Sequence, residues 1–299
     1  MDQAVSIAVD SNYAPFIASY NKIGDPDPTM DEIELLYKDS GGSWTGGMIL
    51  HYDIQVVDLV INPATNQPAI SVDHSPPTIG ALMIFTYDGA NWTHYWGWAT
   101  DNADSAFTYN PANNHPGVAF SQSGSLIFSE WYADETVDSI TLGPALAYTS
   151  TGEPCIAYYN NNVLRYAPKS GTWNIVTVDA AAVETGDDQT IGLAIDGYDR
   201  PHIAYVAAGH WKYAYYDGAT WNVETVGLPA NALRADIVIA PDNNPYIVYQ
   251  TGTDIYFAYR YSGQWILNWF APGYMSMSNL RVDNMGALHM AMKTQPIIP

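Results

Sequence analysis

The chain has 299 residues, with 31 acidic and 10 basic side chains and a formal net charge of −21 at pH 7. This charge argues against nucleic acid as a partner, because binding to phosphates requires clustered Lys and Arg. It also opposes docking on anionic lipid. Hydrophobic residues make up 47% of the chain and charged residues 14%, which predicts a folded protein rather than a disordered one.

No apolar stretch reaches the roughly 18 residues that a membrane-spanning helix needs, so we expect no membrane insertion. The first residues lack the basic and long apolar segments of a signal peptide, and removal of a signal before Met1 is the alternative that an extracellular location would require. Cys155 is the single cysteine, so the chain has no internal disulfide. Because Cys155 lies in an apolar, strand-like run, we predict a buried and inert thiol.

One sequence phrase recurs along the chain: a short apolar strand, a polar turn, a proline, and a second strand that often ends in Tyr. Seven copies occupy residues 6–20, 59–72, 107–120, 145–158, 192–205, 237–249 and 280–291. In the last copy Ala287 stands in place of the proline. We interpret the phrase as the two inner strands of a repeated sheet, since proline at the start of a strand removes no ladder hydrogen bond.

A second phrase follows most copies: an aromatic strand, a tight turn containing Gly, and a Trp that opens another strand. The turn pairs Asp-Gly and Ser-Gly suit hairpins, because Gly accepts a positive φ. The third copy lacks this phrase and has the sequence SLIFSEWY at residues 125–132. We predict that the tryptophans fill the wedge between neighbouring sheets; they are Trp44, Trp92, Trp173, Trp221 and Trp265.

The positions that open the second strands are 38 to 53 residues apart, which is typical of one four-stranded propeller blade. We therefore predict a single all-β domain over residues 1–299, a β-propeller of seven blades with the seventh incomplete. Six blades plus an extra hairpin is the alternative. An incomplete blade leaves a strand edge bare, and another chain could complete it by strand addition.

The phrases at residues 6–10, 201–205 and 213–221 resemble the secreted bacterial repeat propellers of the Asp-box, or sialidase-like, superfamily. The resemblance implies a propeller fold and an extracellular or cell-surface location. It does not imply one function, because this scaffold carries many. Asp88 and Asp217 depart from the Asp-box pattern, since each directly precedes its Gly, and we predict that both only form turns.

Sialidase chemistry would need an arginine cluster for the substrate carboxylate. No sialidase arginine motif surrounds the five arginines of this chain, so we expect them to pair with nearby acids or carbonyl groups. No serine-hydrolase elbow or zinc-binding histidine pair is present either. We predict no catalytic residues.

The strongest polar cluster consists of Asp25, Asp27, Asp31 and Glu32. Its alternating oxygen ligands would suit Ca²⁺, which takes six to eight hard oxygens. The loop lacks the Gly and the terminal Glu of an EF-hand. A solvated acidic loop without a cofactor is therefore the main interpretation, and a calcium site is the alternative.

Aromatic residues near the outer edges are the candidate ligand-binding residues: Trp96 and Trp98 in one outer strand, and Trp269 and Tyr274 near another outer edge. Because side chains alternate with a period of two along a strand, we expect Trp92, His94, Trp96 and Trp98 to share one face of an outer strand. Such side chains could stack on sugars or form a protein interface. Packing between blades is the competing interpretation.

The leading functional hypothesis is a non-catalytic extracellular propeller that acts in adhesion or in self-assembly with other copies of itself. A glycan-binding lectin is the alternative, and a glycoside hydrolase-like enzyme is the second alternative.

Overall fold

The computed structural model describes residues 5–21, 32–38, 41–51, 54–74, 80–100, 105–139, 142–182, 191–227, 232–273 and 280–292. All regular elements in these ranges are β-strands. Within them, no helix has the length and apolar character needed to cross a membrane.

The strands form six sheets with four strand positions each, here blades 1 to 6, and one sheet of two strands. Blade 1 contains β1 (Val5–Val9), β2 (Pro15–Asn21), β3 (Glu32–Lys38) and β4 (Trp44–His51). Blade 2 contains β5 (Ile54–Asn62), β6 (Gln67–His74), β7 (Gly80–Tyr87) and β8 (Trp92–Thr100). Blade 3 contains β9 (Ser105–Tyr109), β10 (Pro116–Gln122), β11 (Ser125–Glu130) and β12 (Ala133–Ser139).

Blade 4 contains β13 (Leu142–Tyr148), β14 (Pro154–Asn160) and β15 (Val163–Ser170), and its outer position is divided between β16 (Thr172–Trp173) and β17 (Val176–Asp179). Blade 5 contains β18 (Ile191–Ile195), β19 (Pro201–Ala207), β20 (His210–Tyr216) and β21 (Trp221–Gly227). Blade 6 contains β22 (Arg234–Ile239), β23 (Pro245–Gln250), β24 (Asp254–Tyr261) and β25 (Gln264–Pro272). The two-stranded sheet consists of β26 (Leu280–Val282) and β27 (Leu288–Met290).

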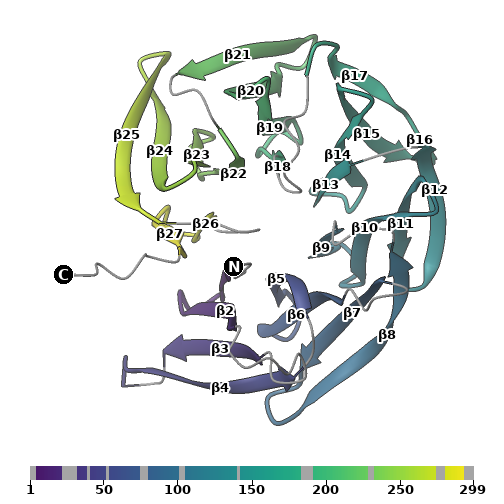
Figure 1. Cartoon of the computed structure of the whole chain (residues 1–299), viewed down its shortest axis with the longest axis vertical. Helices are drawn as coiled ribbons and strands as arrows, with labels where there is room; N and C mark the ends of the chain where they lie inside the picture. The colour runs from purple at the N-terminus through teal and green to yellow at the C-terminus, as the bar shows by residue number, and fades with distance from the viewer. Residues whose placement is uncertain are drawn as a thin grey trace.

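The sheets stand radially around a central axis, with the first strand of each blade innermost (Figure 1). The two-stranded sheet lies between blade 6 and blade 1, since β26 contacts both β22 and β1. The prediction of an all-β propeller is therefore confirmed, with six blades. A seventh blade is not shown, because the last sheet has only two strands in the part of the chain described.

The repeated sequence phrase folds as predicted. Proline opens the second strand in β2, β10, β14, β19 and β23. The preceding turns are built on side-chain oxygens: Oδ1 of Asp196, for example, accepts the backbone N–H groups of Tyr198 and Arg200 at 2.8 and 2.9 Å. Asp88 and Asp217 accept backbone N–H groups in the same manner in the outer hairpin turns, so the prediction that they form turns is confirmed.

These inner turns also link blade 1 to 2, 2 to 3, 4 to 5 and 5 to 6, in what we term the turn relay. Between blades 3 and 4, Nδ2 of Asn110 instead donates to the carbonyl oxygen of Gly152 at 3.0 Å. A residue with positive φ in one turn accepts a hydrogen bond from the backbone of the preceding blade's turn. The acceptors include Asn66, Asn114, Asp199 and Asn243, which bond to Ser11, Ala64, Ser150 and Gly197 at 2.7, 3.1, 2.6 and 2.9 Å. The relay joins neighbouring blades at one end of the ring.

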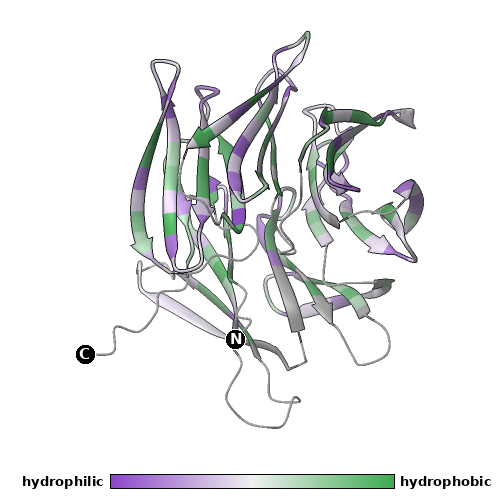
Figure 2. Cartoon of the chain, turned by 45° about the horizontal axis from the view of Figure 1, so that its top comes forward, coloured by the Kyte–Doolittle hydropathy of each residue, from purple (hydrophilic) through white to green (hydrophobic). Residues whose placement is uncertain are grey.

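The hydrophobic core is divided among the spaces between neighbouring blades. Figure 2 shows that apolar and polar residues are interspersed along the strands. The outer tryptophans fill these wedges, as predicted. Trp173 lies edge-on to Phe128 of blade 3, Trp221 edge-on to Tyr166 of blade 4, and Trp265 edge-on to Tyr213 of blade 5. Trp44 is the exception, because it is 50% exposed.

The expectation that Trp92, His94, Trp96 and Trp98 share one strand face is wrong. A β-bulge interrupts the pairing of β7 with β8 between Leu82 and Ile84, so an extra residue reverses the alternation. Trp92 consequently packs in the core between blades 1 and 2, and Trp98 in the core between blades 2 and 3.

Candidate functional site

The hairpin turn between β11 and β12 is unusual. Trp131 and Tyr132 form the turn, and both have positive φ, 49° and 67°. The corresponding turn between β24 and β25 of blade 6 uses Ser262 and Gly263, both also with positive φ, a conformation that Gly adopts without strain. For a bulky aromatic residue the left-handed region costs about 1–3 kcal/mol. Trp131 and Tyr132 are nevertheless 52% and 53% exposed, so the strain presents two large rings to solvent.

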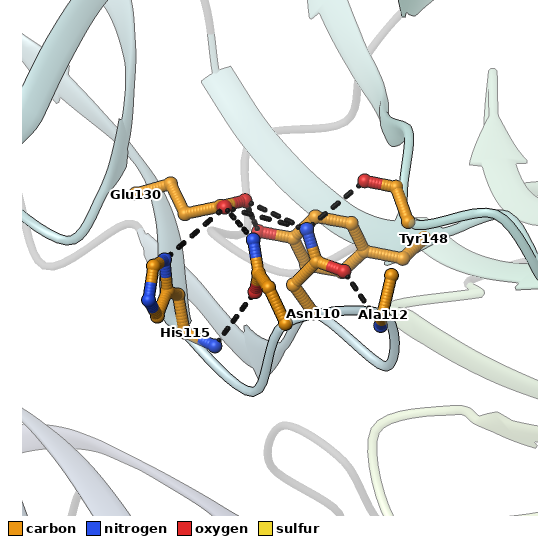
Figure 3. Close-up of polar contacts among 7 residues, drawn as sticks. Asn110, Ala112, His115, Glu130 and Tyr148 are labelled. Atoms are coloured by element: carbon orange, nitrogen blue, oxygen red, sulfur yellow. Dashed lines mark hydrogen bonds and ion pairs between the residues drawn. The ribbon is translucent and has the colours of Figure 1, made fainter.

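The carboxylate of Glu130 fixes the base of this turn (Figure 3). It accepts hydrogen bonds from Nδ2 of Asn113 at 2.8 Å, from the hydroxyl of Tyr148 at 2.8 Å and from Nδ2 of Asn110 at 3.1 Å. Nδ1 of His115 lies 3.8 Å from the same group. Glu130 therefore ties the outer turn of blade 3 to its inner turn and to the first strand of blade 4.

The electrostatics of the cluster keep the Tyr148 phenol as a donor. Burial, and then the neighbouring Glu130 carboxylate, raise the pKa of Tyr148 far above its ordinary value. The phenol therefore stays protonated at any physiological pH, and Glu130 retains its acceptor role. With these donors on its two oxygens, the carboxylate is an anchor for the turn rather than a group left open for ligand.

An aromatic row extends from the turn to both sides. The ring of His115 stacks on Trp131 with centroids 5.0 Å apart, and the ring of Trp98 stacks on Tyr132 with centroids 5.9 Å apart. Nε1 of Trp98 donates to Oδ1 of Asp134 at 3.0 Å, which orients the indole. We call His115, Trp131, Tyr132 and Trp98 the aromatic row. Exposed aromatic faces held in a fixed orientation can stack on the C–H faces of sugars or on flat ligands.

The central channel is a cavity and the second candidate site. It has a volume of about 520 Å³ and is lined by the first strands, with Asp58, Asp236 and Arg281 as its charged residues. Arg281 extends between the two acids, 3.9 Å from Asp58 and 3.8 Å from Asp236. Asp236 also accepts the backbone N–H groups of Leu280 and Ile237. These contacts give both carboxylates a part in holding the two-stranded sheet in the ring.

The structure places the predicted ligand-binding residues in different blades. Trp96 and Trp98 lie on β8 of blade 2, and Trp269 lies on β25 of blade 6, so they do not form one site. Trp98 joins the aromatic row, while Trp269 is 58% exposed and donates to Oδ1 of Asp254 at 2.9 Å. Tyr274 lies outside the described residues.

The predicted calcium loop cannot be placed, because Asp25, Asp27 and Asp31 lie outside the described residues and only the backbone of Glu32 is described. Among the described residues, no group of three or more His, Cys, Asp or Glu side chains could hold a metal ion.

Sequence reasoning missed His115, Glu130 and the turn residues of the aromatic row. The available signal was the sequence Glu-Trp-Tyr at residues 130–132, at the place where other hairpins of the chain have small or glycine-containing turns. A bulky pair at a turn position breaks the local rule, and such breaks concentrate at functional sites.

The fold resembles solved β-propellers. The SapL1 lectin in complex with α-methyl fucoside superposes with a TM-score of 0.59 at 12% identity, over 90% of this chain and 95% of that one. AofleA from Arthrobotrys oligospora gives a TM-score of 0.58 at 9% identity, over 90% and 86% of the two chains. Virginiamycin B lyase from Staphylococcus aureus gives 0.57 at 11%, over 90% and 84%. At these identities the similarity establishes the fold alone.

No protein-family model matches the sequence, and no curated protein sequence does.

Proposed function

We propose that this propeller is a non-catalytic carbohydrate-binding protein whose ligand stacks on Trp131 and Tyr132. The observation that carries the proposal is the strained, half-exposed turn that these two residues form. Backbone strain at two adjacent bulky residues persists only when the surroundings enforce it, and it clusters at ligand-binding sites. Here the Glu130 anchor and the stacking partners His115 and Trp98 enforce it.

The likeness to a fucoside-bound lectin supports a sugar as the ligand, since the two chains share the same ring of sheets. The chain's net charge favours a neutral sugar over an acidic one, because an anionic ligand would be repelled by a protein of charge −21. The aromatic row offers flat apolar surface, and Asn113 and His115 at its edge can bond hydroxyl groups.

We also propose that the protein acts outside the cell and attaches to glycan-bearing surfaces, as the adhesion hypothesis requires. Its non-catalytic character is part of the same proposal: Asp58 and Asp236 are engaged with Arg281 and backbone N–H groups rather than paired across a substrate. Turnover of any member of a broad glycoside panel, abolished by Asp58→Asn, would replace the proposal with the hydrolase alternative.

The experiment is a glycan array with the native protein, followed by titration of the best neutral glycan against a turn variant. The double variant Trp131→Asn, Tyr132→Gly installs residues that favour the same turn, so it removes the rings without opposing the fold. We expect at least a tenfold loss of affinity and a native-like circular dichroism spectrum. Tyr261→Ala is the matched control, because Tyr261 is a 70% exposed aromatic residue of a blade 6 hairpin. Unchanged glycan affinity in the double variant would refute the site.

A second candidate function is assembly with other polypeptides, including other copies of this chain, through the two-stranded sheet. It is favoured by the place of the two-stranded sheet in the ring. This sheet lies between blades 6 and 1, each of which has four strands, whereas the described residues of the sheet form only two. Light scattering across a range of concentrations tests self-assembly directly: a concentration-dependent oligomer supports it, and a monomer throughout rejects it.

A further inference from the structure

A recurring contact joins blades at their outer edges. Nζ of Lys169 donates to Oε1 of Glu135 at 2.5 Å, and Nε1 of Trp173 donates to Oε2 of the same carboxylate at 3.0 Å. Lys169 and Trp173 belong to blade 4, and Glu135 belongs to the fourth strand of blade 3. A basic side chain and an indole of one blade thus both donate hydrogen bonds to a glutamate of the preceding blade. We refer to this Lys or Arg as the base of the pair.

The same contact joins blade 6 to blade 5. Arg260 and Trp265 of blade 6 both donate to the carboxylate of Glu224 in β21. The two examples are equivalent by strand register. Each base lies directly opposite its Trp in the outer hairpin, Lys169 opposite Trp173 and Arg260 opposite Trp265. Each base also lies over that indole ring, 5.8 and 5.4 Å from its centre.

Among blades 2, 4, 5 and 6, the basic residue is present only where the preceding blade carries the glutamate. In blades 2 and 5 a Tyr replaces the base, Tyr87 opposite Trp92 and Tyr216 opposite Trp221. The blades that precede these two are blades 1 and 4. At the position equivalent to Glu224 they carry Gly47 and Val176, so neither offers a carboxylate there. Within this one chain, a base in the pair therefore predicts a glutamate on the neighbour.

Blade 1 has the base and the indole. Lys38 lies directly opposite Trp44, and Nζ of Lys38 is 5.5 Å from the centre of the Trp44 ring. The sheet that precedes blade 1 in the ring is the two-stranded sheet, whose described residues include no third or fourth strand to carry a glutamate. Trp44 is accordingly 50% exposed, whereas Trp173 and Trp265 are partly buried.

The opposite wall of this position is apolar and lacks the acidic group. Phe257 and Tyr259 of β24 stack in a series with Tyr246 and are only partly buried. Asn268 of β25 lies opposite Phe257, just as Glu224 of β21 lies opposite Tyr213 in blade 5. Asn268 therefore occupies the position that is equivalent to Glu224. A sheet inserted here would need apolar side chains toward blade 6, no base, and a glutamate toward blade 1.

We propose that a β-hairpin of a different protein adds to the edge of β27 and places a glutamate on Lys38 and Trp44. The hairpin would supply the third and fourth strands of this sheet by β-augmentation. This chain's own glutamate-bearing hairpins, β11–β12 and β20–β21, are already held within the ring, so a second copy could donate them only by unfolding. The proposal rests on the second candidate function, assembly through the two-stranded sheet, and does not depend on the glycan site, which lies in blade 3.

The probe is a cyclised, fluorescein-labelled peptide that copies residues 210–227, the β20–β21 hairpin with Glu224. Cyclisation is needed because an isolated two-stranded hairpin is barely stable. The matched control peptide carries Glu224→Gln. The protein is tested as the full chain and as the variant Lys38→Met. Position 38 is exposed, so we expect the variant to fold, and its melting temperature is measured as a check.

We expect saturable binding by fluorescence anisotropy, weakened at least tenfold by either change alone. The peptide change and the protein change combined should weaken binding little more than either change alone, because both remove the same interaction. Absence of binding at millimolar peptide, or indifference to both changes, would overturn the proposal. A further variant ends at Met292: if removing residues 293–299 raises the affinity tenfold, those residues already occupy the position and a partner in trans is not required.

Discussion

The hydroxyl group of Tyr148 occupies the volume that a side chain at position 117 would need. A Cβ atom built on Gly117 would lie 1.9 Å from the Tyr148 hydroxyl oxygen. Gly117 belongs to β10 of blade 3, and Tyr148 ends β13 of blade 4. The missing side chain thus lets the phenol reach Glu130 at 2.8 Å and anchor the Trp131–Tyr132 turn.

The first prediction follows from this close approach. Gly117→Ala should displace the Tyr148 hydroxyl and leave part of the Glu130 carboxylate without its donor, lowering the free energy of unfolding by about 1–3 kcal/mol. Urea denaturation measures the loss. Gly47→Ala is the control, because a Cβ at position 47 meets no atom within 4 Å. Equal midpoints for the two variants would contradict the role assigned to Gly117.

The second prediction concerns acid. Burial raises the pKa of Asp179, but hydrogen bonds from Lys212, Ala181 and Tyr205 outweigh it and hold this pKa below its ordinary value. Asp138 is shifted downward in the same way by Tyr158, Ser139 and Arg165. A carboxyl group with a lowered folded-state pKa stabilises the fold above its unfolded pKa and loses that contribution as pH falls through the folded value.

Thermal stability should therefore be nearly constant down to about pH 5 and fall steadily below about pH 4. The measurement is the melting temperature across this range. Asp179→Asn should lower stability at neutral pH and make the decline at low pH shallower. A variant whose acid decline is as steep as that of the native protein would show that Asp179 does not contribute.

The third prediction tests the contact between blades 5 and 6. Glu224→Gln removes the charge that Arg260 and Trp265 share. Because the pair is partly exposed, we expect a modest loss of about 1 kcal/mol, smaller at high salt. Glu153→Gln, at an exposed turn residue, serves as the control. A salt-independent loss would indicate a packing effect instead of an ionic one.

The fourth prediction uses the single cysteine. Burial raises the pKa of the Cys155 thiol to about 11, which leaves almost no thiolate at neutral pH. A thiol reagent such as Ellman's reagent should react with the native protein only as fast as the fold opens, and immediately in denaturant. Rapid reaction of the folded protein at pH 8 would show that β14 is not packed as described.

The architecture could be predicted from the sequence because the inner phrase repeats its turn chemistry and its proline. Each copy specifies the same strand–turn–strand unit, and the spacing defines the blade. The outer strands were less predictable. The bulge in β8 reverses the alternation between His94 and Trp98. Its one local sign is Gly97, where a Cβ would lie 1.4 Å from the carbonyl oxygen of Leu82, and the prediction of a regular strand ignored this sign.

The candidate site was harder to predict than the fold. Glu130 gains its role from Asn110, Asn113 and Tyr148, which come from an inner turn and from the next blade. Periodicity along one strand cannot report such contacts, because they depend on how two blades dock. Trp98 was selected for its ring, and its actual neighbour, Tyr132, became apparent only in three dimensions.

The turn relay has a consequence for how such a ring can change over evolution. At four junctions a turn residue receives a backbone N–H of the turn before it, as Asn66 does from Ser11. These four junctions have the same form and contain nothing that specifies the number of blades. Tandem duplication of a unit bounded by such junctions would therefore create another junction of the same form, so the ring could gain a blade without a new type of contact.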